Sequence, residues 1–290
     1  MMKAKLTVVI LTYNEEIHIE RCINNVIEWV SNVFILDSFS TDKTADLALK
    51  SGAEVFYRKF DDYSSQRNYA IKELPVKTEW MLFLDADEYL TEPLKNEITL
   101  MLSGNNDISG YYIKRRFYFM NKWIKYGGYY PTWLLRLFKT KTATCEGNVN
   151  EHIQVVGKTS NLKNDFIDDN KKGFSSWIDK HNNYSKLEAE QLFQLKKDSL
   201  KKGVKIGLEQ AQRKHWIKLV LWNKLPVLLR PMLYFLYRYF LRLGFLDGRK
   251  GFIYHFMQGY VFWMWVDIKY LELKSMKKID YNDKNIKLPQ

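Results

Sequence analysis

Three acidic side chains follow an apolar run in the stretch EWMLFLDADEYL, residues 79–90. Asp85 and Asp87 are separated by one residue, and Glu88 follows directly. Carboxylate oxygens suit magnesium or manganese, and two of them on a sharp turn can hold such an ion while leaving positions for substrate phosphate. A divalent ion that bridges a diphosphate also neutralises the charge that develops as the diphosphate departs. Because many surface turns contain two aspartates, the surrounding elements decide what this pattern means.

The elements that must position these carboxylates alternate between strand-like and helical patterns. Strand-like runs cover residues 6–11, 33–37, 54–58 and 80–85, and helical patterns cover 15–30, 41–51, 64–74 and 92–102. The alternation predicts an α/β fold with a mostly parallel sheet and helices on both faces. Ligands of such sheets bind at the carboxyl ends of the strands. Polar side chains at three of those ends are therefore expected to converge: Thr12 to Glu15, Asp37, and Asp85 to Glu88.

The middle of the chain has a different texture. Residues 110–156 contain aromatic, strand-like pieces and predict an extension of the sheet. Residues 157–173 are rich in Asn, Asp and Lys and predict a surface loop, and residues 175–202 predict a helix.

The last third combines basic residues with leucine-rich and aromatic helical patterns. Between residues 213 and 250 one acid, Asp247, stands against nine basic residues: Arg213, Lys214, Lys218, Lys224, Arg230, Arg238, Arg242, Arg249 and Lys250. This distribution predicts interfacial helices on an anionic membrane surface. A helical subdomain whose aromatic faces pack on the core is the alternative. The net charge of +12 also favours an anionic partner.

Several classes of protein are disfavoured by the sequence. The two cysteines, Cys22 and Cys145, support neither a disulfide framework nor a zinc site, which fits a reducing cytoplasm. No apolar run reaches the roughly 18 residues of a spanning helix. Neither the dinucleotide-binding glycine pattern nor the P-loop pattern occurs.

Four motifs, in order and spacing, resemble the inverting glycosyltransferases of family 2. They are VVILTYNEE, LDSFSTDKT, SSQRNYAI and FLDADEYL, within about residues 5–155. The later stretches GGYYPTWLLRLF, EGNVNEHI and RLGFLDGRKGF are similar to the branch that contains bacterial lipopolysaccharide-core glucosyltransferases. The resemblance implies a GT-A fold, Rossmann-like, with a catalytic domain at 1–156, a loop and helix closing the acceptor side at 157–205, and a helical membrane-associating region at 206–290.

The resemblance also implies which residues bind the donor: Thr12, Tyr13, Asn14, Glu15, Asp37, Arg67, Asp85 and Ala86. Thr12 to Glu15 would line the base and ribose pocket, and Asp37 would accept the imide hydrogen of uracil. Arg67 would lie near the nucleotide or its diphosphate. Asp85 and Asp87 would form the metal site, with Asp87 as the direct ligand.

Simpler roles remain open for several of these positions. Thr12 and Asn14 are also suitable turn formers, and Asp42 is also suitable as a helix cap. Arg67 could instead pair with Asp61 or Asp62.

Inversion requires a general base that takes the proton of the acceptor hydroxyl. The resemblance places this base at Glu151, in the stretch CEGNVNEHI, with Glu146 as the reserve. The branch typically shows a His-Glu pair, whereas this chain has Asn150 at the position of the histidine and His152 after the glutamate. His152 is therefore expected to orient Glu151 rather than to act alone.

The expected reaction is the addition of one hexose, with Mg²⁺ or Mn²⁺ as cofactor and a UDP-sugar as donor. Glucose from UDP-glucose would pass to a lipopolysaccharide or lipooligosaccharide inner core, lipid-linked or lipid A-linked, at the inner face of the bacterial cytoplasmic membrane. A non-processive reaction is favoured because no Q-x-x-R-W motif occurs. Another UDP-sugar passing to a capsule, O-antigen or protein-linked glycan is the alternative.

Other roles are expected for the acceptor side and for other classes of partner. The stretch GGYYP, Trp133 and Arg136 would form the acceptor wall, although Trp133 suits a packing role equally well. Nucleic-acid binding is disfavoured, because the cations lie in apolar helices and the strand-end carboxylates would repel phosphate unless a metal intervened. A catalytically silent membrane scaffold is disfavoured by the presence of Asp85, Asp87 and Glu151 together.

Overall fold

The computed structural model describes residues 3–104, 107–146, 152–199 and 225–283, which belong to two compact units. Unit 1 is Met1–Gly173 and unit 2 is Phe174–Gln290. Each unit has its own cluster of buried apolar side chains. The division falls after the segment that the sequence predicted as a loop, because most of that segment forms the strand β11 (Lys158–Asp169) of unit 1.

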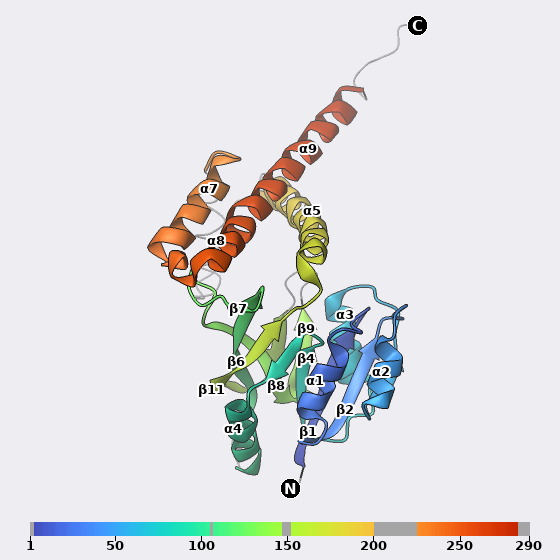
Figure 1. The fold of residues 1–290 in the computed structure, drawn as a ribbon. Coiled ribbons are helices and arrows are strands. Elements are labelled where there is room, and N and C mark those ends of the chain that lie inside the picture. The colour runs from blue at the N-terminus through green and yellow to red at the C-terminus, as the bar shows by residue number, and fades with distance from the viewer. Residues whose placement is uncertain (1–2, 105–106, 147–151, 200–224, 284–290) are drawn as a thin grey trace, which may run out of the picture. The chain divides into compact units, whose positions relative to one another are not determined.

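Unit 1 is built on a sheet with the spatial strand order β3, β2, β1, β4, β8, β6, β11, β5, and with β7 paired to β6 (Figure 1). The strands are β1 (Ala4–Thr12), β2 (Val30–Asp37), β3 (Glu54–Tyr57), β4 (Trp80–Asp85), β5 (Glu88–Leu90), β6 (Ile108–Phe119), β7 (Lys122–Trp123), β8 (Thr132–Lys139) and β11 (Lys158–Asp169). β3, β2, β1 and β4 run parallel, whereas β8 pairs antiparallel with β4 and β6. The predicted parallel arrangement of the first four strands is confirmed.

Helices cover both faces of this sheet. Consecutive strand residues point to opposite sides, and the apolar residues on each side pack against helices. They are α1 (Ile19–Val26), α2 (Thr44–Lys50), α3 (Tyr63–Lys72) and α4 (Glu92–Ser103). Val8 and Ile10 of β1 share a buried cluster with Ile23 of α1. Val9, between them in the sequence, belongs to the opposite cluster with Ala70 of α3. The predicted α/β fold is therefore confirmed.

The prediction of a loop at 157–173 is wrong for most of its length. Residues 158–169 form β11, which pairs with β6 on one side and β5 on the other. Leu162 and Phe166 are buried in the unit 1 core, and Asp165 accepts hydrogen bonds from Tyr130. The polar composition suggested a loop. The segment is a strand because its backbone pairs with β6 and β5 and because its buried acids accept hydrogen bonds. The sheet therefore continues past the predicted domain boundary at residue 156.

The sheet curves back on itself beyond β4. β5 lies at the far end of the strand order although only Ala86 and Asp87 separate it from β4. The path through β8, β6 and β11 must therefore return to the tip of β4. It places Asp168 of β11 opposite Glu88.

A separate antiparallel pair, β9 (Ala143–Glu146) and β10 (His152–Val155), follows the short helix η1 (Thr140–Thr142). Asn68 of α3 fixes this pair, since its side chain donates to the carbonyl of Cys145 at 2.8 Å and accepts from the amide of Cys145 at 2.9 Å. The pair is thereby held beside the helix that carries Arg67.

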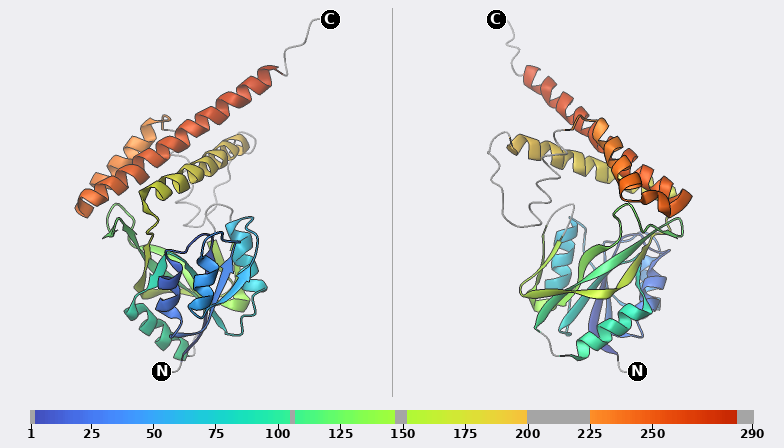
Figure 2. Two further views of the ribbon diagram at one scale, coloured as in Figure 1. Left: turned by 45° about the vertical axis from the view of Figure 1, so that its right-hand side comes forward. Right: turned by 90° about the vertical axis from the view of Figure 1, so that its left-hand side faces the viewer.

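Unit 2 is helical (Figure 2). Its helices are α5 (Gly173–Ser199), α7 (Leu229–Leu236), η2 (Tyr237–Leu241), η3 (Gly244–Asp247), α8 (Gly248–Phe256), η4 (Met257–Val261) and α9 (Phe262–Asp283). Ala189 and Leu192 of α5 pack with Phe262, Val266 and Tyr270. The helix predicted at 175–202 is confirmed to Ser199, and Arg213, Lys214, Lys218 and Lys224 lie outside the described residues. In the described part of the chain, no helix has both the length and the apolarity needed to cross a membrane.

Candidate active site

The carboxyl ends of β1, β2 and β4 lie side by side at one edge of the unit 1 sheet. In the strand register, Thr12 lies opposite Asp37 and Leu11 lies opposite Asp85. Because β1 is between β2 and β4, polar residues from three distant parts of the sequence meet there. The expected convergence is therefore present in the structure.

Asp37 is a buried carboxylate with fixed orientation. Its Oδ1 accepts the hydroxyl hydrogens of Thr12 at 2.7 Å and Ser40 at 2.6 Å, and its Oδ2 accepts the backbone N–H of Ser40 at 2.7 Å. Buried polar groups need such partners. Thr12 therefore fixes the orientation of Asp37 rather than forming a turn. The contact between Asp37 and uracil stays a prediction.

The loop after β1 is tied to the loop after β2. Asn14 has a φ of 54°, in the left-handed region that asparagine tolerates better than most residues. Its backbone N–H donates to Ser40 Oγ at 2.9 Å, and its Oδ1 accepts from the N–H of Thr41 at 2.8 Å. Asn14 therefore does form a turn, as the alternative held, and the ring of Tyr13 beside it is 58% exposed and able to stack on a base.

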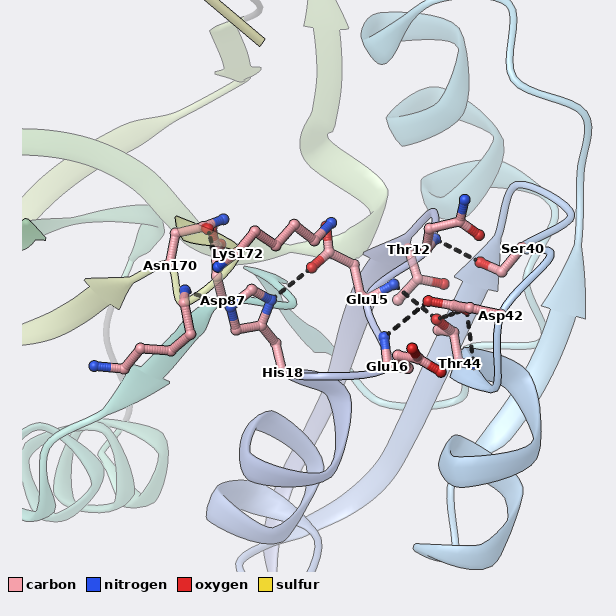
Figure 3. A network of polar contacts seen from close by, with 12 residues as sticks. Thr12, Glu15, Glu16, His18, Ser40, Asp42, Thr44, Asp87, Asn170 and Lys172 are labelled. Atoms are coloured by element: carbon pink, nitrogen blue, oxygen red, sulfur yellow. Dashed lines mark hydrogen bonds and ion pairs between the residues drawn. The ribbon is translucent and has the colours of Figure 1, made fainter. Parts of the chain in front are cut away.

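Asp42 is a structural residue of the same pair of loops (Figure 3). It accepts hydrogen bonds from the N–H groups of Thr44 at 2.9 Å and Glu16 at 3.2 Å. Partial burial acts to raise the pKa of Asp42, but the hydrogen bonds from Thr44 and Glu16 and the charge of Lys172 outweigh it and lower that pKa below its ordinary value. The carboxylate is thus held ionised at the start of α2.

Two arginines neutralise Asp85 at the tip of β4. Arg67 Nη2 lies 3.1 Å from Oδ1, and Arg136 Nη2 lies 2.8 Å from Oδ2. The alternative partners of Arg67 are wrong, because Asp61 pairs with Arg58 and Asp62 accepts the N–H of Ser65 in the first turn of α3. Arg67 therefore lies at the acidic tip.

Arg136 and Glu88 form the buried base of this tip. Arg136 donates to Glu88 at 2.7 Å, and Glu88 also accepts the backbone N–H of Asp85 at 2.9 Å. Burial raises the pKa of Glu88 well above its ordinary value, Arg136 opposes the rise, and the charges of Asp85 and Asp168 add to it. Arg136 was expected to contribute to the acceptor wall, but its guanidinium group is buried against Asp85 and Glu88. Trp133, two strands from β1, is 37% exposed and lies near Lys114, and its acceptor role stays a prediction.

Asp87 retains the capacity to bind a cation. Its Oδ2 accepts a hydrogen bond from Asn170 at 2.8 Å, and its backbone carbonyl accepts from Arg21 at 3.0 Å, so Oδ1 has no protein donor within the described ranges. Those ranges contain no group of three or more His, Cys, Asp or Glu side chains arranged for a metal. Mg²⁺ commonly uses one or two carboxylates together with substrate phosphates and water. Asp87, beside the arginine-bound Asp85, fits that requirement.

Sequence reasoning missed the residues that close the other side of the site. His18 is buried, and it contacts Glu15 at 2.7 Å and the backbone N–H of Lys171 at 2.7 Å. Lys172 lies 2.6 Å from the second oxygen of Glu15. These partners are far apart in the sequence and no motif connects them. The only available signal was the polar DDNKKG stretch, which suggested a loop.

The predicted base lies outside the described residues, which omit 147–151. The flanking strands are defined, with His152 opposite Glu146 in the register of β9 and β10. The reserve residue Glu146 is exposed and accepts a hydrogen bond from Gln154 at 2.8 Å. The role of Glu151 stays a prediction.

Comparison with known proteins identifies the class to which this site belongs. Residues 7–159, more than half of the chain, match the family model Glycosyl transferase family 2. The chain belongs to that family, and the predicted glycosyltransferase class is confirmed.

Several relatives can be named. An uncharacterized glycosyltransferase of Rickettsia typhi is 25% identical over 97% of this chain and 90% of its own. The lipopolysaccharide core biosynthesis glycosyltransferase LpsC of Rhizobium meliloti is 26% identical over 88% of this chain and 90% of its own. An uncharacterized glycosyltransferase of Rickettsia bellii is 37% identical, but the match spans only 37% of this chain and 35% of that protein. Among solved structures, glucosyl-3-phosphoglycerate synthase of Mycobacterium tuberculosis is 23% identical over 39% of this chain and 44% of its own, with a TM-score of 0.33.

Proposed function

We propose that the protein transfers one hexose from a UDP-sugar to a saccharide acceptor with inversion at the sugar carbon. The observation that carries the proposal is the convergence of Thr12, Asp37 and Asp85 at one sheet edge in a member of glycosyl transferase family 2. Tyr13 offers an exposed ring to stack on a base, beside the β1 and β2 ends that the buried Asp37 holds together through Thr12 and Ser40. Together they suit a nucleoside at the β1 and β2 ends.

The diphosphate of the donor would lie toward the acidic tip. Asp87, assisted by Asp85, would hold Mg²⁺ or Mn²⁺, and the ion would supply charge neutralisation to the departing diphosphate. Arg67 and Arg136 keep Asp85 oriented and lower the repulsion between the neighbouring carboxylates. Glu151 would accept the proton of the acceptor hydroxyl as that oxygen bonds to the sugar carbon.

The acceptor is proposed to be an inner-core saccharide of lipopolysaccharide or lipooligosaccharide type. The similarity to LpsC supports this choice because it extends over most of both chains rather than over the family domain alone. Glucose is the proposed sugar, following the motifs shared with core glucosyltransferases.

The distribution of side chains in unit 2 supports an acceptor at a membrane. Both acids within residues 225–270 are buried: Arg230 Nε donates to Asp267 at 2.7 Å, and Asp247 lies 3.0 Å from His255. Large apolar side chains of the same helices are exposed: Leu228, Leu229, Met232, Leu233, Leu236, Tyr237, Phe240, Leu241, Leu243, Phe245, Leu246, Phe252 and Ile253. Arg242, Arg249 and Lys250 are exposed among them.

A soluble helical subdomain has the opposite arrangement, with apolar groups inside and charges outside. Within residues 225–270, exposed apolar and cationic side chains with no exposed acid among them complement an anionic bilayer interface. We therefore propose peripheral attachment to the inner face of the cytoplasmic membrane, where a lipid A-linked acceptor is available.

A transfer assay tests the function. Purified protein with Mn²⁺ would be incubated with UDP-glucose, UDP-galactose or UDP-N-acetylglucosamine and, in separate reactions, a heptose-terminated inner-core, capsule, O-antigen or peptide acceptor. The product mass would be measured. One added hexose from UDP-glucose supports the proposal. Transfer only to a capsule, O-antigen or peptide acceptor would reject the inner-core assignment, and no transfer from any UDP-sugar to any of these acceptors would reject the function.

A further inference from the structure

The segment that follows β11 crosses the proposed donor site and is fixed there by three successive residues. The side chain of Asn170 donates to Asp87 at 2.8 Å, and the backbone N–H of Lys171 donates to His18 at 2.7 Å. The ammonium group of Lys172 donates to Glu15 at 2.6 Å. The segment therefore connects the metal-binding end of the site with the β1 loop.

His18 has a single tautomer in this arrangement. Its Nε2 accepts the N–H of Lys171, so the ring proton lies on Nδ1 and is donated to Oε2 of Glu15 at 2.7 Å. Oε1 of Glu15 then receives Lys172. Glu15 uses one oxygen for each partner, and this double contact fixes its carboxylate beneath the lysine.

The ammonium group of Lys172 retains hydrogen-bonding capacity. A lysine ammonium has three N–H donors, and within the described ranges one is used, by Glu15. The side chain is 26% exposed, so the group is reachable from solvent. Its charge also reaches Asp42 in the loop before α2, where it contributes to lowering the pKa of that carboxyl.

Figure 3 shows Lys172 extended between the Asp87 end of the site and the loops that carry Thr12, Ser40 and Asp42. A donor with its nucleoside at Asp37 and its metal at Asp87 must place its diphosphate in this interval. A fixed cation in this interval would form charge-assisted hydrogen bonds with the diphosphate.

We propose that Lys172 binds the diphosphate of the donor and that Glu15 and His18 are positioning residues that hold the ammonium group in place. This inference rests on the proposed function, because it assumes a nucleoside diphosphate in the site. As the bond from the sugar carbon to the phosphate oxygen breaks, its electron pair stays on the diphosphate, and Lys172 would stabilise that charge. Glu15 would thus act through Lys172 rather than only as a wall of the ribose pocket.

Calorimetric titration of the full chain with UDP and UMP in Mn²⁺ tests the proposal, with uridine affinity measured by its competition against UDP. We expect Lys172→Met to weaken UDP binding about tenfold or more, the effect of losing a charge-assisted hydrogen bond, while uridine binding is unchanged. Lys172→Arg should recover part of the affinity. Lys158→Met is the control, since its ammonium group pairs with Asp107 at the surface of unit 1 and the substitution should leave UDP binding unchanged.

Three results of these titrations would contradict the proposal. UDP affinity in Lys172→Met equal to that of the wild type would overturn the proposal. Equal losses for uridine and UDP would also overturn it, because they would show a structural role. If the wild type binds none of the three ligands, the proposed function itself fails, and the inference fails with it.

Discussion

The carboxyl ends of β1, β2 and β4 form the donor edge of unit 1. This edge and the helices of unit 2 differ in which side chains they expose to solvent. At the donor edge, the ion pairs reach the surface at Asp85, which is 39% exposed, although its partners Arg67 and Arg136 are buried. In unit 2, Arg230 and Asp267 are fully buried, whereas leucines and phenylalanines face outward. The first arrangement prepares polar groups for a small anionic ligand, and the second prepares an apolar surface. Substitutions that separate these two roles test the comparison.

The largest effect is expected at the proposed base. Glu151→Gln removes the proton acceptor while keeping the shape of the side chain, so transfer should fall by about 10²- to 10⁴-fold. UDP-glucose binding should stay at the wild-type level. Rate measurements together with titration distinguish a catalytic loss from a binding loss. Wild-type turnover in Glu151→Gln, combined with a loss in Glu146→Gln, would move the base to Glu146.

The next effect concerns the buried ion pair of unit 2. Arg230→Met leaves Asp267 buried with only the N–H of Leu228 as a remaining donor that the structure defines. Breaking such a pair costs about 3–5 kcal/mol, so α7 and α9 should lose protection from hydrogen exchange by at least about a hundredfold.

The exposed Arg249 provides the control for this substitution, and Arg249→Met should leave the exchange rates unchanged. The donor edge should bind UDP as before in both variants. Equal exchange rates in Arg230→Met and the wild type would show that the buried pair does not stabilise unit 2.

The third largest effect is expected at the proposed metal site. Asp87→Asn keeps the hydrogen-bonding shape but removes the charge, and transfer in Mn²⁺ should fall by about 10²- to 10³-fold, the usual cost of losing transition-state charge stabilisation. Asp107→Asn removes an exposed carboxylate that pairs with Lys158 at the surface, and it should be silent. Full activity of Asp87→Asn, or of the wild type in a chelator, would contradict the metal site.

The smallest effect tests the apolar surface directly, because the two units offer the same residue at the same exposure. Leu241 in unit 2 and Leu100 in unit 1 are both 76% exposed. Leu241→Ser should weaken binding to phosphatidylglycerol vesicles by about tenfold, since burying a leucine contributes about 1.5–3 kcal/mol. Leu100→Ser should leave vesicle binding unchanged. Equal flotation of both variants with vesicles would remove the evidence that unit 2 meets lipid.

The sequence predicted the first four strands of the fold because burial on two faces leaves a local pattern. Runs such as LTVVIL and WMLFLD mark β1 and β4, and their polar ends mark the donor edge. β11 was missed because its stabilisation comes from pairing with β6 and β5, which its Asn- and Asp-rich composition does not reveal.

Contacts within the site were missed for the same reason, because they join residues far apart in the sequence. The contacts from Asn170 to Asp87 and from Lys171 to His18 join residues separated by 83 and 153 positions, and no spacing rule connects them. Arg136 was assigned to the acceptor wall because its strand is aromatic, whereas the curvature of the sheet directs it to Glu88. Tertiary geometry, not local pattern, selects these partners.

The central claim is that the donor edge binds a UDP-sugar through a divalent ion, and calorimetric titration of the wild-type chain tests it most directly. UDP, UDP-glucose, UDP-galactose and UDP-N-acetylglucosamine would each be titrated with Mn²⁺ and with a chelator. We expect UDP and UDP-glucose to bind in Mn²⁺ and to bind at least about tenfold more weakly in the chelator. Absence of binding by every uridine ligand in a folded sample would contradict the account.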